Sequence, residues 1–288
     1  MSRDPGLARL LWRRIEVIHA VTYFSPEPLN ALRDAGYKGF WMGYFAGRAA
    51  PFGEASPELV MATFYNFAEP RVRKAVPDAW SYAPPSAALD ARLAGSVATI
   101  RRAIGDVDVA DVVALARRAA ESAPVDGRPL FAANAALPWP DDPLGALWHA
   151  LTLLREHRGD GHIAALVAAG VAGREAHVLH HPAPIGPPPQ IMAVGRDFDD
   201  AEWSATVGSV AERGLITEQG DLTEAGRSLK QGIEDRTDHI ALSAYEALSD
   251  AEVESLIDGL SPIAKAIIAT GDFPPITPIG PIASGDDF

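Results

Sequence analysis

The segment LLREHRGDGHIAAL, residues 153–166, contains several residues of the types that transfer protons in enzymes, and it lies between two apolar runs. Histidine and glutamate are the side chains that most often donate and accept protons in enzymes. The two glycines of the segment predict the end of one helix and the start of another, and polar groups at such a junction would converge at the rim of a pocket. We therefore regard Glu156, His157 and His162 as candidate catalytic residues for general acid–base chemistry.

The same segment allows two other interpretations. Imidazole and carboxylate groups can ligate a divalent cation. The chain lacks a helix with two histidines at positions i and i+4 and a third ligand, so no metal-ligating residue is assigned and the cofactor stays undetermined. Alternatively, Arg155, Glu156, Arg158 and Asp160 form salt bridges at a helix junction with a purely structural role. The three interpretations remain open at this point.

Other histidine, aromatic and arginine side chains could line the same pocket. An arginine beside aromatic rings can hold a carboxylate or phosphate, because its planar guanidinium donates paired hydrogen bonds. The segment GFWMGYFAGRAAPFG, residues 39–53, has this composition. Its glycines recur every four residues, which alternatively predicts a smooth helix face for close packing. The candidate ligand-binding residues are His19, Tyr23, Trp41, Tyr44, Arg48, Asn134 and His149.

Composition excludes several classes of site and partner. The 288 residues include no cysteine, which excludes disulfides, thiolate metal sites and a cysteine nucleophile. The net charge of −13 opposes a chain-wide attraction to nucleic acid or to anionic membranes. The N-terminus has no signal-peptide pattern, and no run of about 18 apolar residues occurs. We expect a cytoplasmic protein with no membrane partner.

Helical patterning dominates the chain. Helical apolar spacing, proline at first helical positions and terminal glycines predict an all-helical, ligand-binding domain over residues 1–181. Residues 182–190 form a proline-rich linker, residues 191–275 a winged-helix domain with C-terminal helices, and residues 276–288 an extended tail. The predicted fold class is mostly α, with a small β-hairpin in the winged helix.

The C-terminal part resembles the winged-helix module of MarR regulators. The order helix, RGLIT, turn, LTEAGRSL, helix carries this resemblance. In that family the helix before the first strand enters the major groove of DNA. Here that helix offers Asp199, Asp200 and Glu202, and the hairpin tip at residues 218–221 is also acidic. Carboxylates repel phosphates, so we expect a winged helix that is kept for packing or dimerisation, with DNA an unlikely partner.

A broader resemblance covers nearly the whole chain. The blocks IHAVTYFSPE, GFWMGYFAGRAAPFG, VPDAW, RPLFAANAALPWPDDP and LWHALTLLREHRGDGH look like the actinobacterial SalK-like helix-turn-helix family. This resemblance implies a winged helix but no particular reaction.

We therefore expect a protein that binds a small-molecule ligand in its helical domain, with acid–base catalysis as one option. The alternative is a ligand-responsive, MarR-like transcription regulator. In either case the resemblance to MarR proteins implies a homodimer that uses the C-terminal helices.

Overall fold

The computed structural model describes residues 3–180 and 188–274, together with the short strands β1 (Ile276–Thr277) and β2 (Gly280–Pro281). Within these residues the fold is mostly helical, as predicted. The helices of the first part are α1 (Gly6–His19), α2 (Val21–Phe24), α3 (Pro26–Asp34), α4 (Gly39–Ala49), η1 (Ala50–Phe52), α5 (Pro57–Phe64), α6 (Glu69–Ala75), α7 (Ala79–Tyr82), α8 (Pro85–Ile104), α9 (Ala110–Ser122), α10 (Pro129–Ala135), α11 (Pro143–Ala168) and α12 (Gly173–His180). They are followed by α13 (Gln190–Arg196), α14 (Asp200–Glu212), α15 (Glu224–Ala241), η2 (Leu242–Tyr245) and α16 (Asp250–Ala269).

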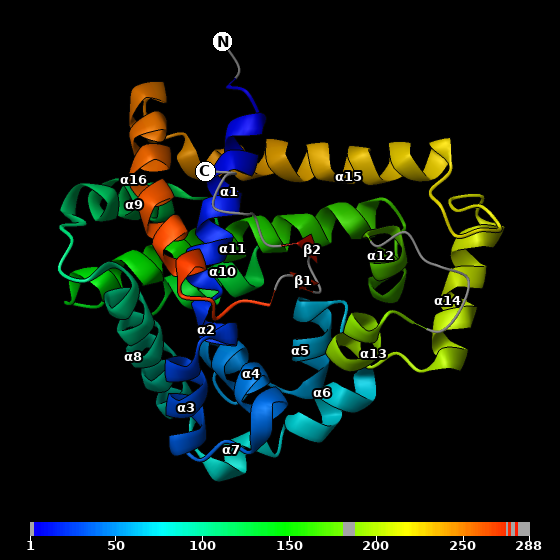
Figure 1. Ribbon diagram of the computed structural model, residues 1–288, viewed down its shortest axis with the longest axis horizontal. Coiled ribbons are helices and arrows are strands. Elements are labelled where there is room, and N and C mark those ends of the chain that lie inside the picture. The colour runs from blue at the N-terminus through cyan, green and yellow to red at the C-terminus, as the bar shows by residue number, and fades with distance from the viewer. Residues whose placement is uncertain (1–2, 181–187, 275, 278–279, 282–288) are drawn as a thin grey trace.

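The longest helix, α11, runs through the middle of the molecule and contacts α15 alongside it (Figure 1). It begins where the sequence predicts, because the Asp142 carboxylate accepts the backbone N–H groups of Leu144 and Gly145 at 2.8 and 3.0 Å. It does not end at the glycines of the segment 153–166, and the helix break expected there is wrong.

Close helix packing accounts for Gly161 inside α11. A Cβ atom on Gly161 would lie 3.0 Å from Cδ1 of Ile240 on α15, so a larger residue would require the Ile240 side chain to shift. A glycine costs an exposed helix about 1 kcal/mol relative to alanine. Tertiary packing offsets such a cost, and the segment therefore stays helical.

The C-terminal helices contribute to two separate apolar cores. The larger core joins α1, α8, α9 and α11 to α16 through residues such as Leu11, Trp148 and Leu256. A smaller core joins the end of α11 to α12, α13, α14 and α15 around Trp203. Helix α16 thus packs on the N-terminal helix α1. The predicted domain boundaries stay predictions, since residues 181–187 lie outside the described part of the chain.

The expected β-hairpin of the winged helix is not formed as a pair of strands. In the described chain after α14, Ile216 and Leu222 form one isolated antiparallel bridge. Backbone hydrogen bonds flank this bridge, from Thr217 to Asp221 at 2.8 Å and from Thr223 to Leu215 at 3.0 Å. The ladder extends no further, because α14 ends at Glu212 and α15 begins at Glu224. The strands β1 and β2 pair with each other in the segment predicted as an extended tail.

The C-terminal helices use their apolar faces within the chain. Val253, Leu256 and Leu260 of α16 are buried, and α16 contacts α1, α8 and α9. A homodimer through the C-terminal helices would have to use their polar outer faces; it stays a prediction. None of the described helices combines the length and the apolar character that crossing a membrane requires.

Candidate functional site

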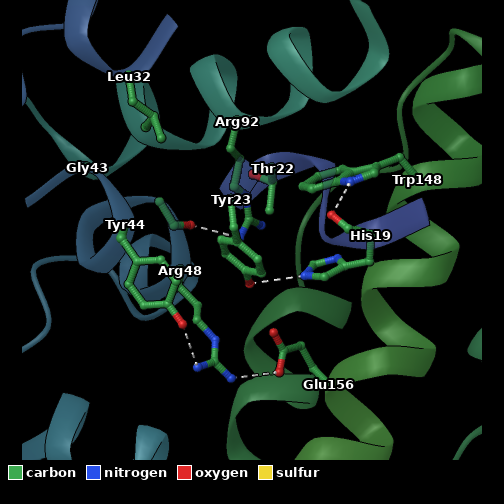
Figure 2. A pocket seen from close by; sticks show the side chains of 11 residues that line it. His19, Thr22, Tyr23, Leu32, Gly43, Tyr44, Arg48, Arg92, Trp148 and Glu156 are labelled. Carbon is green, nitrogen blue, oxygen red and sulfur yellow. Dashed lines mark hydrogen bonds and ion pairs between the residues drawn. The ribbon is translucent and has the colours of Figure 1, made fainter. Parts of the chain in front are cut away.

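A small cavity lies where the end of α1 meets α2, α4, α8 and α11 (Figure 2). Its volume of about 10 Å³ corresponds to roughly one water molecule. Polar and aromatic side chains form most of its wall. The lining residues are His19, Thr22, Tyr23, Leu32, Gly43, Tyr44, Gly47, Arg48, Arg92, Trp148 and Glu156.

A chain of hydrogen bonds fixes the tautomer of His19. The Thr152 hydroxyl donates to the Trp148 carbonyl at 2.9 Å, so it accepts from Nδ1–H of His19 at 3.0 Å. Nε2 of His19 is then the acceptor for the Tyr23 hydroxyl at 3.1 Å. Burial, and secondarily Arg155, hold the pKa of His19 well below its usual value, while burial raises the pKa of Tyr23. The proton therefore stays on Tyr23, and His19 is neutral.

Glu156 is a buried counter-charge for two arginines. Its carboxylate accepts from Arg155 at 2.9 and 3.0 Å and pairs with Arg48 at 3.3 Å. Arg155 also pairs with Glu16 at 3.1 Å. Burial alone would raise the pKa of Glu156, but Arg155 and Arg48 outweigh it and lower the pKa to about 2. Glu156 is ionised at neutral pH and holds no proton to donate.

Arg92 on α8 is a second buried guanidinium at the cavity. It donates to the Gly47 carbonyl at 2.9 Å and to Oδ1 of Asn134 at 2.8 Å. Among the described residues, no carboxylate lies within ion-pair distance of Arg92. Burial lowers its pKa to about 10, although Tyr23 and Glu156 partly oppose this effect. The cavity wall therefore holds more positive than negative charge.

The structure brings together much of the ligand-binding set predicted from the sequence. His19, Tyr23, Tyr44 and Arg48 line the cavity, as does Glu156. Trp41 packs edge-on against Tyr44, with ring centroids 5.7 Å apart, and so lies one layer outside. Asn134 supports the cavity indirectly, because it accepts a hydrogen bond from Arg92.

The glycine spacing of α4 also has its expected packing role. Gly43 and Gly47 both face Leu32 of α3, and a Cβ atom on Gly43 would lie 3.4 Å from the Leu32 Cβ atom. The packing interpretation of this segment therefore holds for Gly43 and Gly47, and its role in a ligand site stays a prediction.

Sequence reasoning missed Arg92, although the sequence contains a signal for it. In a helix over residues 85–104, Arg92 shares a face with the small residues Ala88, Gly95 and Ser96. All four residues are buried. A charged residue on the small, buried face of a predicted helix is unusual and points to a polar site.

Three of the predicted histidines do not reach the cavity. His149 packs edge-on against Trp139, with ring centroids 4.8 Å apart. His162 hydrogen-bonds Thr237 on α15 at 3.0 Å. His157 packs edge-on against Phe131 at 5.2 Å, and neither of its ring nitrogens has a hydrogen-bond partner.

The expected convergence of these histidines with Glu156 is therefore wrong. The reason is that α11 continues through the segment, so successive side chains turn by about 100° per residue. Glu156 and His157 consequently point to different sides of the helix, and His162 to a third. Burial lowers the pKa of His157 to about 3 and that of His162 to about 4.

The remaining charges of the segment serve other helices. Arg158 pairs with Asp238 on α15 at 3.0 Å. Asp160 accepts the N–H groups of Leu130 and Phe131, both at 2.9 Å, at the start of α10. These contacts agree with the structural alternative for this part of the segment. Across the residues that the structure describes, no three histidine or acidic side chains gather closely enough to hold a metal ion.

Comparison with known proteins identifies the family. The profile of a helix-turn-helix family matches residues 8–274, and the chain therefore belongs to that family. No curated protein and no solved structure gave a significant match. The narrower resemblances to SalK-like and MarR-type proteins stay predictions.

Proposed function

We propose that this member of the helix-turn-helix family binds a small molecule through a carboxylate or phosphate group at the cavity between α1, α2, α4, α8 and α11. One observation carries the proposal: Arg92 lines the cavity, is buried, and has no carboxylate partner in the described chain. A buried cation without a counter-charge costs several kcal/mol of folding free energy. An anion that enters the cavity would offset this cost.

Arg48 is held in a way that permits such an anion to enter. Its contacts with Glu156 at 3.3 Å and with the Tyr44 hydroxyl at 3.5 Å are longer than most N–H···O hydrogen bonds. Binding anything larger than water requires the wall to move, because the cavity is so small. We infer that Arg48 and Tyr44 swing outward and that Arg48 then pairs with the ligand.

Aromatic side chains supply a surface for the rest of the ligand. Phe40 is 43% exposed and stacks on Tyr44, with ring centroids 6.1 Å apart. Trp41 packs edge-on against both rings. An anionic group at Arg48 and Arg92 would leave an apolar or aromatic remainder against these rings. The favoured ligands are therefore aromatic or aliphatic carboxylates and phosphate monoesters.

We favour binding over the acid–base catalysis predicted from the segment 153–166. Glu156 is fully ionised at neutral pH, and His157 and His162 point away from it. Among these three predicted residues, no proton donor therefore lies beside a proton acceptor.

The family match favours a second candidate, a ligand-responsive transcription regulator of the MarR-like kind. The surface of α14 argues against it, since Asp200 and Glu212 are exposed on this helix. Arg213, which follows α14, pairs with Glu175 at 2.6 Å and so has its charge offset. We therefore rank ligand binding without DNA recognition first.

A thermal-melting series tests the proposed function. Sodium acetate, benzoate, phosphate and phenyl phosphate each replace sodium chloride at equal ionic strength, and benzylamine serves as a cationic probe. A bound anion at about a hundred times its Kd should raise the unfolding free energy by about 2.7 kcal/mol, which corresponds to a rise in Tm of several degrees.

Two variants show whether the effect belongs to the site. Arg92→Met should lose the rise in Tm. Arg33→Met is the matched control, because the Arg33 side chain is 66% exposed on the surface. It should retain the rise, since it leaves the cavity intact. Equal shifts in the wild type and in Arg92→Met, or stabilisation by benzylamine, would refute the proposal.

A further inference from the structure

Arginines of the preceding helices (residues 3–180, called the helical body below) hold α13 in place. Arg71 donates to the Val194 carbonyl of α13 at 2.9 Å and forms an ion pair with Asp197, the residue after α13. Arg174 donates to the Arg196 carbonyl at 2.7 Å. Both arginines thus bind carbonyl groups at the end of α13, where a helix leaves them without internal partners.

Arg196, the last residue of α13, points into the body without a counter-charge. It is 7% exposed, and its guanidinium lies over the ring of Phe67 at 4.3 Å. Its Nε atom has no hydrogen-bond partner. Within residues 3–180 and 188–274, no carboxylate lies within ion-pair distance of it. Arg196 is therefore held by stacking on the Phe67 ring. Its burial without a counter-charge lowers the free energy of unfolding.

Arg196 shares one aromatic cluster with the candidate site. Arg48 stacks on Phe64 at 4.2 Å, as Arg196 stacks on Phe67, and the two phenylalanine rings are 6.4 Å apart. The ring of Tyr44 packs on Phe67 at 5.5 Å. The guanidinium groups of Arg48 on α4 and Arg196 on α13 thus contact the same cluster of aromatic rings.

Arg196 resembles Arg92 at the cavity, because both are buried arginines without a carboxylate within ion-pair distance in the described chain. Burial is the main cause that lowers the pKa of Arg196 to about 10, and the nearby cations Arg48, Arg174 and Arg155 lower it further, whereas Tyr44 opposes the shift. Arg48 and Arg196 therefore repel each other across the cluster. Glu156 pairs with Arg48 and Arg155, and Glu202 pairs with Arg174 at 2.7 Å, but no carboxylate in the described chain pairs with Arg196.

We propose that Arg196 couples α13 to the ligand: an anion bound beside Tyr44 and Arg48 attracts Arg196 and tightens the attachment of α13 to the helical body. This inference rests on the proposed function. It names the ligand by charge alone, as a carboxylate or phosphate, and assigns Arg196 as the residue that responds to it. Because coupling is reciprocal, a tightly attached α13 also raises the affinity of the cavity for the anion.

Hydrogen exchange of residues 190–212 tests the coupling. Sodium acetate or sodium phosphate replaces sodium chloride at equal ionic strength, and exchange is followed in the intact protein. In the wild type the anion should slow exchange in this segment by about tenfold, within the usual range of coupling between sites. Residues 110–122 of α9 lie outside both sites and serve as the internal reference. The effect should disappear in Arg196→Met and persist in Arg33→Met.

A second comparison needs no ligand. In chloride alone, Arg196→Met should leave exchange of residues 190–212 unchanged or slower, because it replaces an unpaired buried cation with an apolar side chain. Arg174→Met should accelerate exchange, because it removes the donor to the end of α13. Faster exchange in Arg196→Met would overturn the inference.

The two proposals fail in different ways. An anion that raises the Tm of the wild type but leaves exchange of residues 190–212 unchanged overturns the coupling and leaves the proposed function standing. An anion that changes neither quantity overturns both.

Discussion

At the scale of single residues, Glu156 holds the candidate site together electrostatically. It is the one carboxylate among the cavity-lining residues and contacts both Arg48 and Arg155. We expect Glu156→Gln to lower the free energy of unfolding by about 3–5 kcal/mol, the usual cost of stranding a buried charge. Arg48 then has no carboxylate partner, while Arg155 keeps Glu16. Urea denaturation measures the loss.

Glu254→Gln is the control for this experiment. Glu254 is exposed on α16, and such surface substitutions usually change stability by less than about 0.5 kcal/mol. A loss in Glu156→Gln no larger than in the control would show that Glu156 is not a required counter-charge.

Residue types and local spacing predict part of this site. The histidine, tyrosine and arginine of HAVTY and GYFAGR suffice to nominate His19, Tyr23, Tyr44 and Arg48, which the fold brings together. The charge state of Glu156 could not be predicted from local spacing, because its pKa depends on burial and on both Arg155 and Arg48, and Arg48 is far away in sequence. Asn134 was predicted, but its partner Arg92 was not, since no local pattern links α8 to α10.

At the scale of elements, the position of α3 depends on a glycine in α8. A Cβ atom on Gly95 would lie 2.3 Å from the Cα atom of Pro28, which is backbone and cannot move alone. We expect Gly95→Ala to destabilise the protein by about 1–3 kcal/mol or more, as overpacking does, and to displace α3 from the wall of the cavity. Thermal or urea unfolding measures the effect.

Gly208 on α14 is the matched control for Gly95. Nothing lies within 4 Å of a Cβ atom built there. Gly208→Ala should therefore stabilise the protein by up to about 1 kcal/mol through helix propensity alone. If both alanine variants shifted stability in the same direction, close packing would not be the reason for Gly95.

The surface of α14 predicts weak interaction with DNA. The Ser204 and Thr206 hydroxyls donate to carbonyl groups of their own helix at 2.7 and 2.8 Å, and the neighbouring charges are acidic. We expect no sequence-specific binding at physiological salt in fluorescence anisotropy with DNA from the promoter of the protein's own gene. Submicromolar binding that weakens in Ser204→Ala or Thr206→Ala would favour the regulator.

Helix positions could largely be predicted from local signals, but two features could not. Asp142 with Pro143, and Ser56 with Pro57, start helices as expected. The continuity of α11 depends on α15 packing against Gly161, which no local pattern reveals. The expected hairpin is reduced to one bridge between Ile216 and Leu222, because α14 and α15 leave only a short connection between them.

At the scale of the whole molecule, four histidines with lowered pKa values, three of them buried and His162 partly buried, predict a steep loss of stability in mild acid. Burial holds the pKa of His19 well below its usual value, and lowers those of His149 and His162 to about 4 and that of His157 to about 3. The unfolded chain binds these protons near pH 6.5. Stability is therefore complete above about pH 6.5 and falls with decreasing pH toward the folded pKa values.

Each histidine should cost about 1.4 kcal/mol per pH unit in this window. Asp160 acts in the opposite direction, because burial raises its pKa to about 6 and the folded protein then binds its proton more tightly. The net slope should correspond to about three protons. Urea unfolding at a series of pH values between about 7 and 5 measures it. A flat profile would show that these histidines are solvated in the folded protein.

The central claim, that an anion binds between Arg48 and Arg92, is tested most directly by NMR of arginine side chains. The Nε–H resonances of the two buried arginines, assigned by their loss in Arg48→Lys and Arg92→Lys, are followed during titration with sodium acetate and sodium phosphate at constant ionic strength. We predict saturable shifts of both resonances with one common Kd, and no saturable shift for exposed Arg33. Shifts that stay linear, or that affect exposed arginines equally, would contradict the account.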